Sequence, residues 1–242
     1  MANRLEFLLN NLPSWVRLTS NDTADGFAIT ANPKLFGGEN GESFSLVIKN
    51  TASKIEVSEN EVGRKLPPHC PERHINKGGI FCIGLNAGEL ISSDAEAQQW
   101  WDWLEEYLRL QQTASQLGVW PVQSGLAHGK AAEYQIKIEE IGAKLGWSEK
   151  VLNSIFLNQK RVISLLPNYK QQGVTKLRKR AACPLGCIYK RKLAKIKNCH
   201  EQDFRKLIDL ETAFHQHTKD FIKNFKECGG ECCQTMKNCP FK

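Results

Sequence analysis

A stretch dense in chemically capable side chains runs from Leu66 to Leu85. It contains two cysteines, two histidines, an arginine and an asparagine, together with three prolines and two adjacent glycines. Proline lacks an N–H donor and glycine weakens a helix, so the stretch predicts a shaped loop. Groups able to attack, donate or accept a proton are therefore concentrated on one loop, and function is to be sought there first.

Cys82 lies within a short apolar run, Ile80 to Ile83, which predicts a small extended segment. A thiol becomes a useful nucleophile when its pKa falls, and neighbours such as Arg73 and His74 can lower it. Acyl chemistry at sulfur also needs a donor to the oxygen that turns negative, and the side-chain amide of Asn76 is a donor of that kind. On residue types alone, an inert cysteine packed as a small hydrophobe is the alternative.

The residues from His74 to Ile83 read His-Ile-Asn-Lys-Gly-Gly-Ile-Phe-Cys-Ile, which resembles the active-site segment of ubiquitin-conjugating enzymes. In that family a His-Pro-Asn tripeptide, a Gly-containing loop and the acceptor cysteine follow in this order. The resemblance implies that Cys82 accepts the modifier as a thioester and that His74 and Asn76 match the tripeptide. Ile75 stands where the family has proline, and the spacing from Asn76 to Cys82 is shorter than in the eukaryotic enzymes.

The resemblance is closer to the bacterial branch of the family. Members of that branch are encoded beside activating enzymes, ubiquitin-like modifiers and metallopeptidases, often in antiviral defence operons. Some of them carry a cysteine-rich extension. The resemblance thus implies a partner set of a ubiquitin-like modifier, an activating enzyme and a target protein.

The segments around the loop predict the elements that position it. Residues 3 to 11 space their leucines as an amphipathic helix does. Strands separated by turn-forming residues are predicted at 15–18, 27–30, 44–48 and 54–57. After the loop, the capping box from Ser93 to Glu96 begins a helix with Trp100 and Trp101 on its buried side. The ubiquitin-conjugating (UBC) fold has this order, so we expect an α+β domain, an antiparallel meander with flanking helices, over residues 1–135.

Composition restricts the class of protein. The 242 residues are 41% apolar and 24% charged, with no apolar run near the ~20 residues that a membrane helix needs. Charged residues near the amino terminus argue against a signal peptide, so we expect a cytoplasmic protein without membrane contact. In that compartment, nine cysteines favour metal binding or thiol chemistry over a disulfide framework.

The net charge of +7 is unevenly distributed along the chain. Residues 151–200 contain twelve Lys or Arg and no Asp or Glu, so the remainder carries −5, the difference between +7 and +12. Two predicted helices, 138–145 and 149–158, flank a Gly-Trp-Ser turn in the outline of a helix-turn-helix. A basic helical connector over 136–182 is therefore expected, and nucleic acid is a candidate partner for residues 151–200. A protein partner and a solvated surface are the alternatives.

His128 follows the helix break at residues 118–121. It could return to the loop as a base or as an orienting donor, because histidine titrates near neutral pH. The alternative is a histidine near a helix start that is satisfied by local backbone.

The last part of the chain, residues 183–242, is cysteine-rich. It contains two Cys-x-x-x-Cys units, and an apolar stripe predicts a long helix over 201–226. A second helix over about 188–198 would fold back on it if a structural zinc ion tied the ends together. The zinc ligands would be Cys183, Cys187, Cys228 and Cys232. An iron–sulfur cluster is less favoured, and reduced structural thiols or disulfides formed on isolation are the alternatives.

The resemblance and the residues together imply a transferase that accepts a ubiquitin-like modifier on Cys82 and passes it to an amine. Asn76 would donate to the oxyanion, and His74 or His128 would orient the amine or take its proton. The chemistry itself needs no cofactor. The alternative is a non-catalytic scaffold of the same fold that binds nucleic acid or a protein through its basic, cysteine-rich half.

Overall fold

The computed structural model divides the chain into two compact units. The first unit comprises Met1–Ser124 together with Gly230–Lys242, and the second unit comprises Gly125–Gly229. The structure describes residues 4–23, 25–35, 37–121, 125–156, 161–171, 174–237 and 239–242. Among these, no helix combines the length and the apolarity that a membrane span requires.

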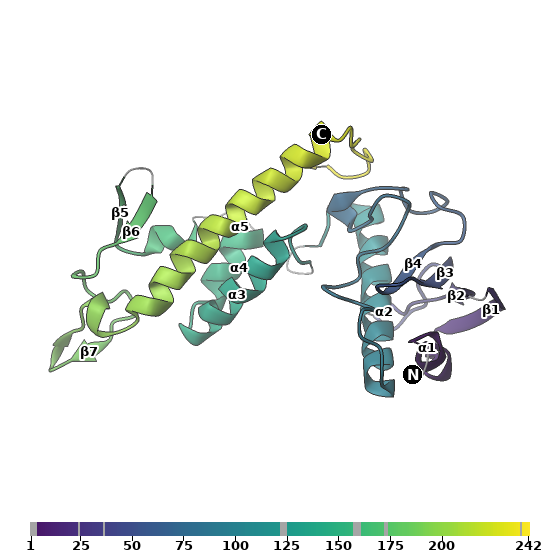
Figure 1. The fold of residues 1–242 in the computed structure, drawn as a ribbon, viewed down its shortest axis with the longest axis horizontal. Coiled ribbons are helices and arrows are strands. Elements are labelled where there is room, and N and C mark those ends of the chain that lie inside the picture. Colours follow the sequence, from purple (N-terminus) through teal and green to yellow (C-terminus); the bar gives the residue numbers. More distant parts are fainter. Residues whose placement is uncertain are drawn as a thin grey trace. The chain divides into compact units, whose positions relative to one another are not determined.

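The first unit is a four-stranded antiparallel meander with a helix before it and a helix after it (Figure 1). Its elements are α1 (Arg4–Asn10), β1 (Val16–Thr23), β2 (Gly26–Ala31), β3 (Phe44–Asn50), β4 (Ile55–Glu59), the short 3-10 turn η1 (Pro71–Arg73) and α2 (Asp94–Leu117). Neighbouring strands pair in sequence order, β1-β2-β3-β4. The predicted order of helix, meander, loop and helix is confirmed in this part of the chain.

Alternating burial shows why these residues form the sheet. In β3, Phe44, Leu46 and Ile48 are buried while the residues between them are not. In α2, Trp100 and Trp101 are each 1% exposed, so both belong to the core as predicted. The Nε1 of Trp101 donates to the carbonyl oxygen of Leu8 at 3.2 Å, which ties α2 to α1.

The predicted capping box begins α2. Ser93 has an extended backbone, and its Oγ accepts from the backbone N–H of Glu96, while a carboxylate oxygen of Glu96 accepts from Ser92 N–H at 2.8 Å. At the other end, Gly118 adopts a left-handed φ of 69° and ends the helix. Local sequence signals therefore fix both ends of the helix that supports the loop.

The second unit mixes helices with small β-hairpins. Its elements are α3 (Ala131–Lys144), α4 (Ser148–Phe156), η2 (Val162–Leu165), β5 (Asn168–Gln171), β6 (Val174–Leu177), β7 (Ile188–Tyr189), β8 (Lys192–Leu193), η3 (Ile196–Asn198) and α5 (Glu201–Glu227). The predicted long helix is confirmed as α5, and the predicted helix pair as α3 and α4. Positions 157 and 158, assigned to the second helix of that pair, lie outside the described residues.

The predicted helix over about 188–198 was wrong. This segment forms the β7–β8 hairpin and the 3-10 turn η3. Lys190 and Arg191 take left-handed φ values of 49° and 63°, and this pair of residues makes the tight turn between the two strands. The region expected to be helical therefore contains two hairpins, β5–β6 and β7–β8, and only α5 is long.

The end of the chain belongs to the first unit. We predicted boundaries at residues 135 and 182, whereas the compact units meet at Ser124 and the segment after Gly229 joins the first unit. Within that segment Met236 and Phe241 are buried. The backbone N–H of Lys237 donates to the carbonyl of Gly118 at 2.7 Å, so the segment is attached to the end of α2.

Candidate active site and thiol clusters

The stretch Leu66–Leu85, which we call the Cys82 loop, is built from short β-bridges. Cys70 and Ile75 exchange two backbone hydrogen bonds of 3.0 and 2.9 Å, and Ile75 in turn pairs with Phe81. Phe81 N–H donates to the carbonyl of Val57 in β4 at 2.9 Å. The loop is therefore an irregular extension of the meander, and Cys82 lies at the outer edge of this extension.

A buried arginine fixes this loop to α2. Arg73 is 2% exposed; its Nε donates to Oε1 of Gln111 at 2.8 Å and its Nη2 to Oγ of Ser115 at 2.6 Å. In return, Nε2 of Gln111 donates to the carbonyl of Arg73 at 2.6 Å. Arg73, which we had considered as a neighbour able to lower a thiol pKa, anchors the backbone, and its charge acts on the pKa of Cys70 and not on that of Cys82.

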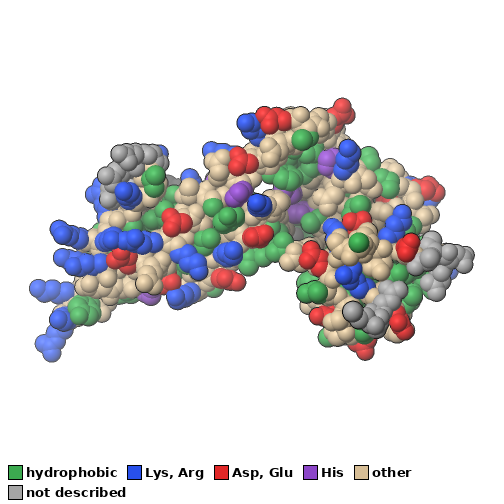
Figure 2. Space-filling view, viewed as in Figure 1, with side chains coloured by type: hydrophobic (Ala, Val, Ile, Leu, Met, Phe, Trp, Pro, Cys, Tyr) green, Lys and Arg blue, Asp and Glu red, His purple; other side chains and the backbone are tan. Residues whose placement is uncertain are grey.

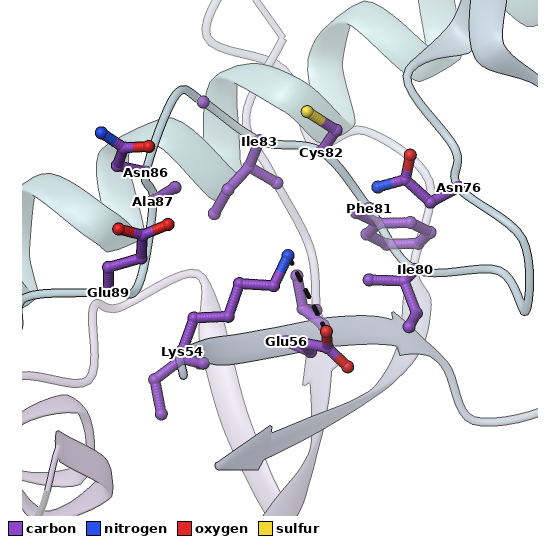
Figure 3. A pocket seen from close by; sticks show the side chains of 13 residues that line it. Lys54, Glu56, Asn76, Ile80, Phe81, Cys82, Ile83, Asn86, Ala87 and Glu89 are labelled. Carbon is purple, nitrogen blue, oxygen red and sulfur yellow. Dashed lines mark ion pairs between the residues drawn. The ribbon is translucent and has the colours of Figure 1, made fainter. Parts of the chain in front are cut away.

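Cys82 is exposed and lies at a polar pocket (Figure 3). Asn76 lines the same pocket, as the sequence interpretation required, with Gly84, Asn86 and Glu89 further along it. Lys54 and Glu56, both from the β4 region, form its opposite wall and are joined by an ion pair of 3.8 Å. Figure 3 shows the Lys54 ammonium group directed into this space.

Two opposing effects set the pKa of Cys82. Burial of the thiol raises the pKa, although the residue as a whole reaches the surface. The charge of Lys54 and a backbone hydrogen bond from Gly84 lower the pKa. Burial is the larger effect, so the pKa is raised overall. The resting group at neutral pH is therefore the thiol, with Lys54 as the nearby cation that favours its ionised form.

The two histidines are placed differently from Asn76. His74 is not among the residues that line the pocket; its ring lies 5.1 Å from that of Trp120, centroid to centroid. Its backbone is the part that touches Cys82, because the His74 carbonyl accepts from Cys82 N–H at 2.8 Å. His128 belongs to the second unit, where its ring stacks on Phe221 and burial lowers its pKa to about 4. The role in orienting the amine that we predicted for either ring stays a prediction.

Sequence reasoning missed the far wall of the pocket. Lys54 stands just before β4 and Asn86 after the loop, with a left-handed φ of 57°. Only the pairing of the loop with β4 brings Lys54 near Cys82. No local pattern marks such a contact.

A thiol cluster lies in the second unit. The sulfur atoms of Cys183, Cys187 and Cys199 all fall within 4.8 Å of one another. Backbone hydrogen bonds hold them there: Cys183 N–H donates to Ala194 and Ala194 N–H donates to Cys187, each at 2.7 Å. Burial raises the pKa of Cys199 to about 12, and so do hydrogen bonds that its S–H donates to Cys187 and Cys183. A divalent cation would let all three thiols lose their protons.

This cluster differs in membership from the predicted zinc set. Cys183 and Cys187 are brought together as expected, but the third sulfur is that of Cys199. Cys228 is exposed at the end of α5, and Cys232 lies in the segment that belongs to the first unit. Soft thiolate ligands suit zinc, so the donor set fits a structural metal ion.

Comparison with known families divides the chain between residues 122 and 127, and the second match includes the last segment, which packs with the first unit. Residues 18–122 match the family model of the prokaryotic E2 domain, and residues 127–241 match that of the cysteine-rich domain that lies C-terminal to the E2 domain. No curated protein and no solved structure matches the chain. The two matches together describe a prokaryotic E2-like protein with a cysteine-rich C-terminal extension.

Proposed function

We propose that this chain is a ubiquitin-conjugating-like acyltransferase of a bacterial conjugation pathway, acting in the cytoplasm and in antiviral defence. An activating enzyme would present the carboxy-terminal acyl group of a ubiquitin-like modifier as a thioester. The Cys82 sulfur would attack that carbonyl carbon and release the thiol of the activating enzyme. An amine of the target would then attack the new thioester, so that an amide forms and the Cys82 thiol is released.

One observation carries this proposal: the exposed thiol of the loop shares a polar pocket with an amide and a cation. Asn76 lines the pocket and is of the type that donates to a developing oxyanion. Lys54 favours the thiolate that attack requires. Glu56 and Glu89 on the same pocket are suited to receive a cationic amine before it loses its proton.

A charging assay tests the proposal. The full chain would be incubated with ATP, a bacterial activating enzyme of this type and the ubiquitin-like modifier that this enzyme activates. We expect a modifier adduct that thiol reductants cleave, no adduct on Cys82→Ala, and on Cys82→Ser either none or an oxyester that resists reductant. Cys228→Ser is the matched control, since Cys228 is also an exposed cysteine. A reductant-sensitive adduct on Cys82→Ala would refute the assignment.

We also propose that Cys183, Cys187 and Cys199 hold a structural zinc ion. The closeness of the three sulfurs supports this, and structural zinc contributes directly to folding free energy. The ion would stabilise the segment before α5 and take no part in acyl transfer.

A second candidate function is nucleic-acid binding by the two hairpins of the second unit. Ten exposed Lys and Arg side chains surround them (Figure 2); these are Lys170, Lys176, Arg178, Lys179, Arg180, Lys190, Arg191, Lys192, Lys195 and Lys197. Ile188 and Tyr189 beside them are 68% and 49% exposed. Basic groups next to an exposed aromatic ring suit phosphates and stacked bases. A protein partner with an acidic surface is the remaining alternative.

Binding of a fluorescent oligonucleotide, measured at two salt concentrations, distinguishes nucleic acid from an acidic protein as the partner. Neutralising Lys190, Arg191 and Lys192 together should weaken binding and flatten its salt dependence, because phosphate contacts release counterions. The same number of alanines at Lys206, Lys219 and Lys223, which are exposed on α5, is the control. Equal binding by both triple variants would count against nucleic acid as the partner of the hairpins.

A further inference from the structure

An amine of the chain itself lies at the pocket of Cys82. Lys54 lines this pocket together with Cys82 and Asn76, and Figure 3 shows its Nζ atom directed into the pocket. The Lys54 side chain is 37% exposed, so the amine is accessible. Transfer of an acyl group from the sulfur to an amine is the last step of the proposed function, and a lysine amine is already present at the same pocket as that sulfur.

The backbone holds Lys54 in this place. Lys54 closes the turn between β3 and β4: its N–H donates to Oγ1 of Thr51 at 3.1 Å, and its carbonyl accepts from Thr51 N–H at 2.9 Å. The N–H of the next residue, Ile55, donates to the carbonyl of Gly88 at 3.0 Å, which attaches the start of β4 to the segment after Cys82. Gly88 has a left-handed φ of 83°, and a Cβ there would lie 2.8 Å from the Ile55 carbonyl oxygen, so this close approach requires glycine. The base of the Lys54 side chain is therefore fixed at the pocket wall.

The ion pair of Lys54 leaves its amine able to react. Nζ lies 3.8 Å from Oε1 of Glu56, and the two side chains are 37% and 26% exposed. Exposed ion pairs are weak, so the amine can leave this partner. A lysine must lose a proton as it attacks a carbonyl carbon, and the Glu56 carboxylate is placed to accept that proton. Glu56 is one of the two carboxylates suited to receive the amine of a target, and Lys54 is already paired with it.

We propose that Lys54 is a self-modification site, which accepts the modifier from Cys82 when no target amine is bound. This inference rests on the proposed function, because it starts from the Cys82 thioester. Nζ of Lys54 would attack the thioester carbonyl carbon, the C–S bond would break and an amide would form. The Cys82 sulfur would leave as a thiolate and take up the proton that Nζ loses, so that the thiol is restored. Two groups held at one pocket react at a high effective concentration, which favours Lys54 over lysines elsewhere on the chain.

A synthetic thioester of a short peptide that ends in glycine tests the inference without an activating enzyme. The full chain would exchange its thiols with this reagent, and a thiol reductant would then remove the thioesters and leave the amides. Peptide mapping by mass spectrometry should find the glycyl amide on Lys54, at a yield about tenfold or more above that on Lys77. Lys77 is the matched control, because it is exposed on the Cys82 loop and is not among the residues that line the pocket.

Three variants locate the route of the acyl group. Cys82→Ala removes the donor, so the amide on Lys54 should fall to the level found on Lys77. Lys54→Arg keeps the positive charge without a nucleophilic amine, so position 54 should carry no amide and Lys77 should gain none. Lys77→Arg should leave the Lys54 amide unchanged. Yields are expressed per Cys82 thioester formed, and circular dichroism verifies that each variant is folded.

Three outcomes would overturn the inference while the proposed function stands. These are a Cys82 thioester that forms without an amide on Lys54, equal amide on Lys54 and Lys77, and an undiminished Lys54 amide in Cys82→Ala. If the peptide thioester does not acylate Cys82, the same mapping is applied to chain incubated with ATP, the activating enzyme and the modifier, without a target. Absence of a Cys82 thioester under both conditions would refute the proposed function and this inference together.

Discussion

Two irregular segments of this molecule are held in place by different means. The Cys82 loop of the first unit buries Leu66, Ile75 and Phe81 and is attached to α2 by Arg73. The segment Cys183–Cys199 of the second unit, here the thiol segment, has 68% exposed Ile188 and 59% exposed Leu193. The first has a core and a polar anchor of its own. The second leaves the tip of its hairpin exposed and buries Cys183, Ala194 and Ile196 at its base, where the proposed zinc ion would add a cross-link.

Both units nevertheless use one buried charge to attach irregular chain to a long helix. In the second unit that charge is Glu211 of α5, which is 2% exposed. Its carboxylate accepts from the N–H groups of Val162 and Ile163 at 2.7 and 2.8 Å and from Ser154 Oγ at 3.1 Å. Glu211 thus caps η2 as Arg73 anchors the Cys82 loop, and neither contact reaches the thiol segment. The comparison predicts that loss of the proposed zinc ion would unfold the thiol segment alone.

The largest expected effect is that of Cys199→Ser. Structural zinc is worth about 10–16 kcal/mol in small zinc-binding peptides, and Cys199 supplies one of the proposed ligands. Hydrogen exchange of residues 179–199 should therefore become fast, while exchange of residues 70–82 stays slow. Cys228→Ser should alter neither region. Unchanged exchange of residues 179–199 in Cys199→Ser would show that the thiol segment is held without a metal.

Arg73→Met should have the next largest effect, on the first unit. It removes the hydrogen bonds to Gln111 and Ser115 and leaves buried acceptors without donors, at a cost of about 3 kcal/mol or more in the free energy of unfolding. Urea denaturation monitored by tryptophan fluorescence measures this change in the free energy of unfolding. Arg64→Met is the control, because the side chain of Arg64 is 61% exposed and should contribute under about 0.5 kcal/mol.

Glu211→Ala should destabilise the second unit by about 2–3 kcal/mol, because it leaves two buried N–H groups unpaired. Glu211→Gln keeps one carbonyl oxygen as an acceptor, so its effect should be smaller. Thermal unfolding followed by circular dichroism compares the two variants, with Glu227→Gln at the exposed end of α5 as the control. Equal stability of all three would show that η2 is held by packing alone.

The two units show what the sequence can and cannot predict. Alternation in β3 and the Ser93 cap are local signals, and the elements that they predict are present. The hairpin at Lys190 and Arg191 carries no such signal, since neither residue type favours a left-handed backbone, and a helix was expected instead. Local patterns therefore predict the regular elements better than the short turns.

Site membership was predicted in part, for a related reason. Asn76 and Cys82 lie in one short stretch, so a motif could bring them together. Lys54 reaches the same pocket only through the pairing of the loop with β4. Spacing of Cys-x-x-x-Cys units suggested partners for Cys183, but the hairpin that brings in Cys199 was not foreseen.

The smallest expected effect concerns the pH dependence of charging. Burial raises the pKa of Cys82, so the reactive thiolate is a minor form below that pKa and its amount rises about tenfold per pH unit. Charging should therefore speed up as pH increases from 7 toward 9. Lys54→Met removes the cation that lowers the pKa, which moves the profile to higher pH and slows charging at pH 7.5 by up to about tenfold, or 1.4 kcal/mol.

Lys65→Met is the matched control, because the Lys65 side chain is 39% exposed against 37% for Lys54 and pairs with Glu42 rather than lining the pocket. Charging rates of both variants, measured across this pH range, separate a local from a general charge effect. If Lys54→Met is as slow at pH 9 as at pH 7.5, Lys54 acts on binding of the modifier or the activating enzyme. If the two variants have the same charging rates across this pH range, the effect comes from the net charge of the first unit. If the charging rate of Lys54→Met alone is reduced, and the reduction becomes smaller as pH rises, Lys54 acts on the ionisation of Cys82.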